Sequence, residues 1–215
     1  MSCYLCGSTV SLTADHVPPK GFFPQPRPTN LITVSCCKAC NNSFSKDDEA
    51  MRLWLSANIA RSKAADWIWE NKVLPRTVVR SPTLVDKMLE SSRDVVFSTD
   101  AGEQEATAFE IPADRVERFV VRVTKGLLRH YFPDYDYSSA TFDVRSIPPT
   151  ASSLALLNDV KERLDYDFRG EGVFQFRRGL TDTKESGVWL LLFYESTLFL
   201  VAHSKNKWGA VAVAG

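Results

Sequence analysis

The sequence predicts an α+β fold, in which a small cysteine-rich module is followed by helices and a C-terminal antiparallel sheet. Three observations support this prediction. All five cysteines lie within the first forty of the 215 residues. Apolar side chains recur at helical spacing through the middle of the chain, and β-branched and aromatic runs separated by turn residues fill its end. We therefore expect a module over residues 1–48 and an α+β domain over residues 49–215.

The module combines short strands with a proline-rich loop. β-like stretches lie at Ser11–Thr13 and Leu31–Ser35. The prolines between residues 18 and 28 exclude a helix, because proline lacks the N–H donor that a helix interior needs. A helix is expected from about Lys46 to Lys72, where apolar residues follow a helical stripe, with Ser45 as a candidate cap.

Beyond the module, helical patterns come first and strand patterns follow. The middle of the chain predicts helices over Thr83–Ser92, Ala113–Tyr131 and Ser152–Leu164, a strand at Val95–Phe97 and a loop over residues 98–108. The last part of the chain predicts strands over Val173–Arg177, Val188–Glu195 and Thr197–His203. This order predicts helices that pack on an antiparallel sheet.

Four of the cysteines form two Cys-x-x-Cys pairs, Cys3 with Cys6 and Cys37 with Cys40. Two thiolates at this spacing bind one tetrahedral ion, and two such pairs complete a four-sulfur zinc site. A disulfide framework would usually spread its bridges through the fold. Cys36 is an alternative ligand to Cys37, but only Cys37 keeps the two-residue gap to Cys40. We expect a structural zinc, with Cys36 as a small packed side chain.

Polar residues lie between and directly after the two pairs. Asp15-His16 comes first, Asn30-Leu31 follows a loop, and Asn41 comes directly after Cys40. In this order the first fifty residues resemble the HNH nucleases, also called the ββα-metal or His-Me finger family, in the zinc-bearing branch. The resemblance implies a ββα-metal module that hydrolyses nucleic-acid phosphodiesters, with a catalytic Mg²⁺ or Mn²⁺ in addition to the zinc.

The resemblance implies catalytic roles for four side chains. His16 would be the general base, because a neutral imidazole accepts a proton from water near pH 7. Asp15 and Asn41 would offer hard oxygen ligands that suit Mg²⁺ or Mn²⁺. Asn30 would tie down the loop and orient His16. Each residue also has an ordinary explanation: a polar surface for the Asp-His pair, a turn for Asn30 and a helix cap for Asn41.

Candidate phosphate-binding cations lie in the module and in the helix expected over residues 113–131. The cations of the module are almost balanced by nearby acidic residues; they are Lys20, Arg27, Lys38 and Lys46, of which Lys20 and Lys46 are the candidates for binding nucleic acid. The helix carries a basic row at spacings of three and four, made of Arg115, Arg118, Arg122, Lys125 and Arg129. Such a row either meets phosphates or forms a solvated face with salt bridges, and the second interpretation is favoured.

The formal net charge is zero, whereas many nucleic-acid binders are basic. Binding would then rest on a local basic patch, a protein partner or a second copy of the chain. We expect a metal-dependent endonuclease acting on double-stranded DNA, with restriction or phage defence as a role by family analogy. The alternative is a zinc-stabilised nucleic-acid- or protein-binding module without catalysis.

The first residues leave no room for a secretory signal, and no apolar run reaches the length of a membrane span. The expectation is therefore a cytoplasmic protein.

Overall fold

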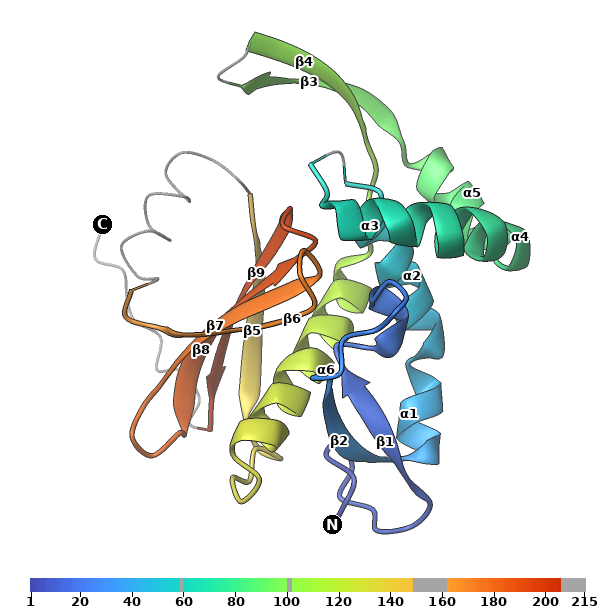
Figure 1. Cartoon of the computed structure of the whole chain (residues 1–215). Helices are drawn as coiled ribbons and strands as arrows, with labels where there is room; N and C mark the ends of the chain where they lie inside the picture. Colours follow the sequence, from blue (N-terminus) through green and yellow to red (C-terminus); the bar gives the residue numbers. More distant parts are fainter. Residues whose placement is uncertain (59, 100–101, 149–161, 206–215) are drawn as a thin grey trace.

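The computed structural model describes residues 1–58, 60–99, 102–148 and 162–205. Within these ranges the chain is α+β, with helices and a C-terminal antiparallel sheet, as the sequence predicts. Figure 1 shows a two-stranded hairpin, a second hairpin that projects from the body, and a five-stranded sheet. No helix in these ranges combines the length and the apolar character needed to cross a membrane.

The N-terminal part runs strand, strand, helix. Its elements are β1 (Leu12–Val17), the 3₁₀ turn η1 (Lys20–Phe22), β2 (Ile32–Cys37) and α1 (Lys38–Ser43). β1 and β2 pair antiparallel, which places Asp15 opposite Val34 and His16 opposite Thr33. Phe22, in the loop between the strands, is fully buried. The loop is therefore anchored in the core despite its prolines.

The long helix expected from about Lys46 to Lys72 is broken in the structure. Its place is taken by α2 (Ser45–Ser56), α3 (Lys63–Ile68) and the π-helical segment η2 (Trp69–Thr77). The hydroxyl of Ser62 accepts a hydrogen bond from the Ala65 amide at the start of α3 and donates one to the carbonyl of Gly172. This tertiary contact favours a new helix start at residue 63. Ser45 does not cap α2, because it is the first residue of the helix and Phe44 precedes it.

The middle of the chain contains two short helices, a hairpin and one long helix. The elements are α4 (Val78–Arg80), α5 (Pro82–Glu90), β3 (Arg93–Thr99), β4 (Gly102–Ala108) and α6 (Ala113–Tyr131). The expected helices at 83–92 and 113–131 and the strand at 95–97 are confirmed. The expected loop over 98–108 is wrong, because β4 pairs there with β3. The β4 sequence is polar and mostly exposed, so it lacks the alternation that marks a strand.

The C-terminal sheet is antiparallel, with strand order β5-β9-β8-β7-β6. Its strands are β5 (Thr141–Ile147), β6 (Asp165–Arg169), β7 (Phe174–Leu180), β8 (Ser186–Phe193) and β9 (Thr197–Ser204). The three expected strands are confirmed as β7, β8 and β9. The edge strands β5 and β6 were not expected. The helix expected over 152–164 falls largely outside the described residues.

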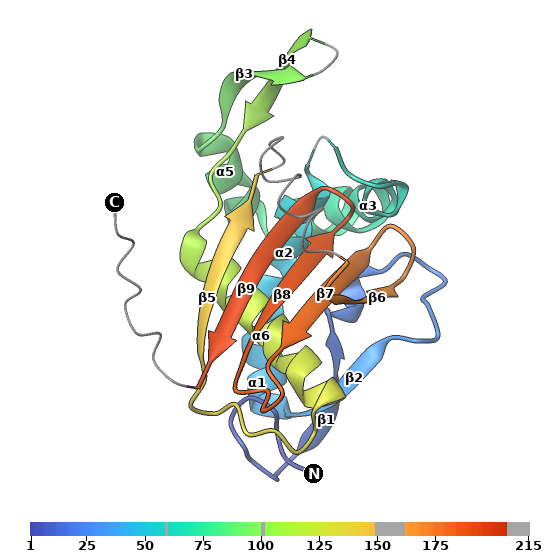
Figure 2. The same ribbon diagram turned by 90° about the vertical axis from the view of Figure 1, so that its left-hand side faces the viewer.

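Helix α6 joins the hairpin to the sheet. Figures 1 and 2 show α6 lying between β1–β2 and the five-stranded sheet. The Phe119 ring in α6 stacks on Phe22 with centroids 5.3 Å apart and lies 5.7 Å from Phe193 in β8. Gly126 lies so close to β1 that an added Cβ would come within 2.5 Å of a Val17 methyl carbon. The hairpin and the sheet thus share one continuous core.

Candidate active site

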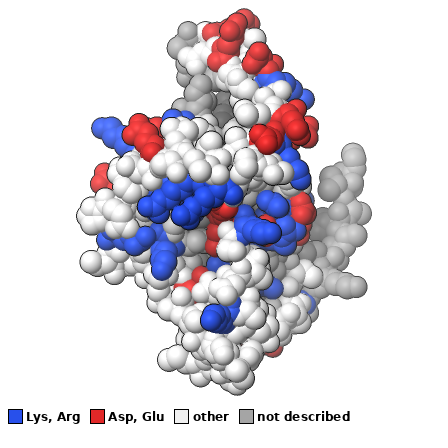
Figure 3. Space-filling model, turned by 90° about the vertical axis from the view of Figure 1, so that its right-hand side faces the viewer, with Lys and Arg blue, Asp and Glu red and all other residues white. Residues whose placement is uncertain are grey.

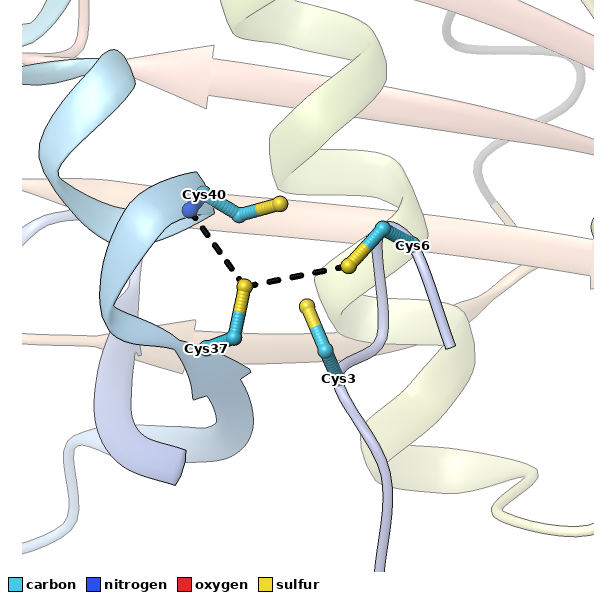
Figure 4. A group of neighbouring side chains, drawn as sticks. All are labelled: Cys3, Cys6, Cys37 and Cys40. Carbon is cyan, nitrogen blue, oxygen red and sulfur yellow. Dashed lines mark hydrogen bonds between the residues drawn. The ribbon is translucent and has the colours of Figure 1, made fainter. Parts of the chain in front are cut away.

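Four cysteine sulfurs converge beside the hairpin, as Figure 4 shows. Cys3 and Cys6 lie in the N-terminal turn, Cys37 ends β2 and Cys40 lies in α1. Their Sγ atoms all lie within 4.8 Å of one another. The sulfur of Cys37 accepts a hydrogen bond from the Cys40 amide at 3.4 Å. Four sulfurs gathered in this way can hold one metal ion.

Cys36 stays outside this group. It pairs with Thr13 across the hairpin and is fully buried. Its Sγ lies 3.8 Å from the Sγ of Cys3, but it is not one of the four sulfurs that all lie within 4.8 Å of one another. The structure brings together the predicted set with Cys37, and Cys36 is the packed residue that the spacing indicates.

His16 lies on the face of β1 opposite to Asp15 and is half-buried. Partial burial lowers the pKa of the His16 imidazole below its ordinary value of 6.5, and the cations Lys20 and Arg27 lower it further, whereas Asp15 opposes the shift. The imidazole is therefore mostly neutral at pH 7. This is the protonation state that a general base requires.

Asp15 points into the protein, where internal donors surround its carboxylate. Nη2 of Arg122 in α6 donates to both carboxylate oxygens, at 2.9 and 3.0 Å, and the Tyr4 hydroxyl donates at 2.9 Å. Arg122 also donates to Asp48 in α2 at 2.6 Å, and its side chain is only 3% exposed. A guanidinium thus neutralises the carboxylate for which the resemblance implies a divalent ion. Asp15 does not fit a metal-ligand role in this arrangement.

In this cluster of Asp15, Asp48 and Arg122, the one guanidinium forms ion pairs with both carboxylates. Burial raises the pKa of Asp48 to about 6, although Arg122 opposes this shift. The guanidinium also lies over the Phe44 ring, 4.7 Å from its centroid. The cluster therefore links α6, β1 and α2 at the centre of the module.

The two asparagines differ in their contacts. The Asn41 amide nitrogen donates to the Thr13 hydroxyl at 3.2 Å, so this residue ties α1 to β1 instead of capping a helix. Asn30 is exposed in the turn before β2. Among the described residues, its side chain forms no hydrogen bond that would orient His16. The turn explanation is therefore sufficient for Asn30.

Three members of the basic row on α6 pair with acidic side chains of the protein. Arg118 contacts Asp47 at 3.1 Å and Asp114 at 2.6 Å, and Arg115 contacts Asp47 at 3.6 Å. Arg122 is buried in the cluster described above, so the prediction that it meets phosphates is corrected. The salt-bridge interpretation explains this part of the row.

The remaining predicted cations differ from one another in their contacts and exposure. Lys125 lies over the Phe142 ring, 5.4 Å from its centroid, and burial lowers its pKa. Arg129 donates to the Pro133 carbonyl at 2.8 Å. Lys46 is exposed at the start of α2. Helix α6 thus uses its basic residues mainly for contacts inside the protein.

Comparisons with known proteins do not identify the chain. No family model matches it, and no significant match was found among characterised proteins or solved structures. Function therefore has to be inferred from the site itself.

A second group of cations adjoins His16 through Lys20 and Arg27; the sequence indicated these two as cations of the module, but only Lys20 was predicted to bind nucleic acid. The group is named here the basic cluster and consists of Lys20, Arg27, Arg52, Lys72 and Arg76. Its members come from the loop between β1 and β2, from α2 and from η2. They are too far apart in sequence to form a motif, so only the tertiary fold reveals them.

Proposed function

We propose that this chain is an HNH-type endonuclease that hydrolyses phosphodiester bonds in nucleic acid, with His16 as its general base. The observation that carries the proposal is the setting of His16. It lies on the first strand of a strand–strand–helix unit that carries a four-cysteine site at its other end, and its pKa is held below the ordinary value. Lys20 and Arg27 provide positive charge beside it, which attracts a phosphate and opposes the negative charge that develops during attack.

Zinc is the proposed occupant of the four-cysteine site. A four-sulfur set favours zinc, and a site with all four ligands from the protein is structural. Zinc bound by Cys3, Cys6, Cys37 and Cys40 would hold the N-terminal turn against the end of β2 and the start of α1. Its role is to stabilise the hairpin that carries His16.

The proposed chemistry of the chain's own residues is proton transfer by His16. The imidazole takes a proton from water as the water oxygen forms a bond to phosphorus. The bond from phosphorus to the leaving oxygen breaks, and the leaving oxygen takes up a proton from solvent. Because Arg122 and Tyr4 occupy the carboxylate of Asp15, no step is assigned to a divalent ion at that residue.

A zinc-stabilised binding module without catalysis is the second candidate. The occupied carboxylate of Asp15 favours it, because hydrolysis of phosphodiesters commonly uses a metal ion as Lewis acid. In that case nucleic acid would still bind near His16, but it would not be cut.

The deciding experiment is plasmid cleavage by the full-length protein. We expect nicking or linearisation of supercoiled DNA, and a decrease of about 10²–10⁴-fold in the His16→Ala variant, because that variant lacks the general base. Reactions are run with and without added Mg²⁺ or Mn²⁺. The matched control is His130→Ala, since His130 is exposed on α6 and lies outside the hairpin. Equal rates for wild type and His16→Ala, or no cleavage by folded zinc-loaded protein, would contradict the proposal.

The pH dependence of cleavage follows from the pKa of His16. Activity should rise as pH rises through a pKa below 6.5 and should level off near neutral pH, because the neutral imidazole is the active form. Lys20→Ala removes a cation that lowers this pKa, so the acidic limb should move to higher pH. The profile of kcat/KM against pH measures this shift. Lys38→Ala, at an exposed position in α1, serves as the control that leaves the limb in place.

A further inference from the structure

The basic cluster is held together by contacts with backbone and hydroxyl groups. Nζ of Lys72 donates to the carbonyls of Gly21 and Phe23, at 3.0 and 2.9 Å, which ties η2 to the loop before β2. Nη2 of Arg52 donates to the Thr77 hydroxyl at 3.3 Å. The cations are therefore positioned by the fold.

Salt bridges within the described residues do not balance this charge. In the described part of the chain, none of the five side chains forms an ion pair with Asp or Glu, in contrast to the arginines at the start of α6. Asp48 lies one helical turn before Arg52 and attracts it electrostatically, but its carboxylate is hydrogen-bonded to Arg122. The Nε atom of Arg52 is buried and has no hydrogen-bond partner. Arg52 thus retains an unused donor.

The crowding of like charges disfavours the protonated form of Lys72. Burial lowers the pKa of Lys72 to about 8, and the neighbouring cations Arg27, Arg52 and Arg76 add to the shift. An anion bound among these side chains would relieve their repulsion. The cluster also adjoins His16 through Lys20 and Arg27, which both lower the pKa of that imidazole.

The cluster is a local feature and does not reflect the overall composition. The chain has a formal net charge of zero, yet Figure 3 shows Lys and Arg side chains gathered across the middle of one face. Lys72 and Arg76 belong to η2, a π-helical segment, and such segments are frequent at functional sites. Arg27 and Arg76 are exposed and available to a ligand.

We propose that the basic cluster is the surface that binds the phosphate backbone of the nucleic-acid substrate and leads it past His16. This inference rests on the proposed function, because it assigns the substrate-binding surface of that site. The ligand is a chain of phosphodiesters recognised by charge, so binding is independent of base sequence. Lys20 and Arg27 hold the phosphates nearest to His16, and Arg52, Lys72 and Arg76 hold the neighbouring ones.

The test measures binding separately from cleavage. A fluorescent DNA duplex is titrated with His16→Ala protein by fluorescence anisotropy at several salt concentrations. Adding Arg27→Gln and Arg76→Gln should weaken binding at least tenfold at low salt. It should also reduce the slope of log Kd against log salt by about 2, close to 0.9 for each lost phosphate contact. Both residues are exposed, so folding is retained, and each single variant should reduce the slope by about 1.

The control removes the same charge elsewhere. Lys87→Gln with Arg93→Gln alters exposed positions in α5 and β3 and should leave the salt slope unchanged. Equal effects of the two double variants, or no DNA binding by any protein, would overturn the inference. Binding through the cluster without cleavage by wild type would support the inference and reject the nuclease. Cleavage that depends on His16 but is unaffected by Arg27→Gln and Arg76→Gln would support the nuclease and reject the inference about the basic cluster.

Discussion

Replacing Cys40 with Ser is expected to abolish metal binding and to unfold the N-terminal module. The Sγ of Cys40 is one of four sulfurs within 4.8 Å of one another. Structural zinc sites in small modules contribute on the order of 10–16 kcal/mol of apparent binding free energy, and a two-stranded hairpin is marginal without such support. We expect loss of zinc by elemental analysis and a decrease in Tm of roughly 10 °C or more. A chelator should have the same effect on the wild-type protein.

The control for this prediction is Cys36→Ala. Cys36 is fully buried but lies outside the four-sulfur group. Its replacement should leave one zinc per chain and should lower stability only through the lost packing of one sulfur. If Cys36→Ala lost the metal while Cys40→Ser retained it, the ligand set would have to be reassigned.

The effect of zinc loss should extend beyond the turn that carries the cysteines. Tyr4 lies between Cys3 and Cys6, and its hydroxyl donates to Asp15. The carbonyl of Tyr4 also accepts a hydrogen bond from the Tyr137 hydroxyl at 2.9 Å. Release of the turn therefore loosens the contacts that fix β1, so plasmid cleavage should be lost together with the metal.

The features predicted from sequence are those with a local signal. The two cysteine pairs have a spacing that is typical of a metal site, and the structure brings their sulfurs together. The long helix Ala113–Tyr131 has a sustained apolar stripe, and its bounds are as predicted. Parts of β7 and β9 alternate between buried and less buried positions, and β8 contains the continuous apolar run Trp189–Leu192.

The features that were missed depend on contacts between distant residues. The helix that starts at residue 45 ends at Ser56, and the contact of Ser62 with Gly172 fixes the next helix, which no local pattern could indicate. β4 is a strand because it pairs with β3, although its own residues are polar. Edge strands share this weakness, since few of their side chains reach the core.

The same reasoning applies to the site. His16 could be singled out because it stands in a motif, whereas the role of Arg122 depends on partners in other elements. Within α6, Arg122 repeats the spacing of Arg115 and Arg118, so sequence alone treats the three alike. Only packing separates them, since α6 presses Arg122 against Asp15 while its neighbours stay partly exposed.

Replacing Arg122 with Ala is expected to lower the free energy of unfolding by about 3–5 kcal/mol, because it leaves the buried carboxylate of Asp15 and the half-buried carboxylate of Asp48 without their cation. Asp15 is 4% exposed, and the pKa of Asp48 is about 6 even with Arg122 present. Without the guanidinium the pKa of Asp48 should rise further above its unfolded value. A carboxyl with a raised folded-state pKa favours the fold below its unfolded pKa and loses that contribution as pH rises through the folded pKa. The deficit should therefore be larger at pH 8 than at pH 5.

Urea unfolding at the two pH values tests this prediction against a matched exposed arginine. Arg145 pairs with Asp143 on the surface, where their side chains are 70% and 52% exposed, so Arg145→Ala should leave the midpoint almost unchanged. Combining Arg122→Met with Asp15→Asn and Asp48→Asn should recover much of the lost stability, because no charge is then buried without a partner. Equal midpoints for Arg122→Ala and Arg145→Ala would show that the guanidinium does not compensate buried carboxylates. Asp15 would then be free to bind the divalent ion that the resemblance implies.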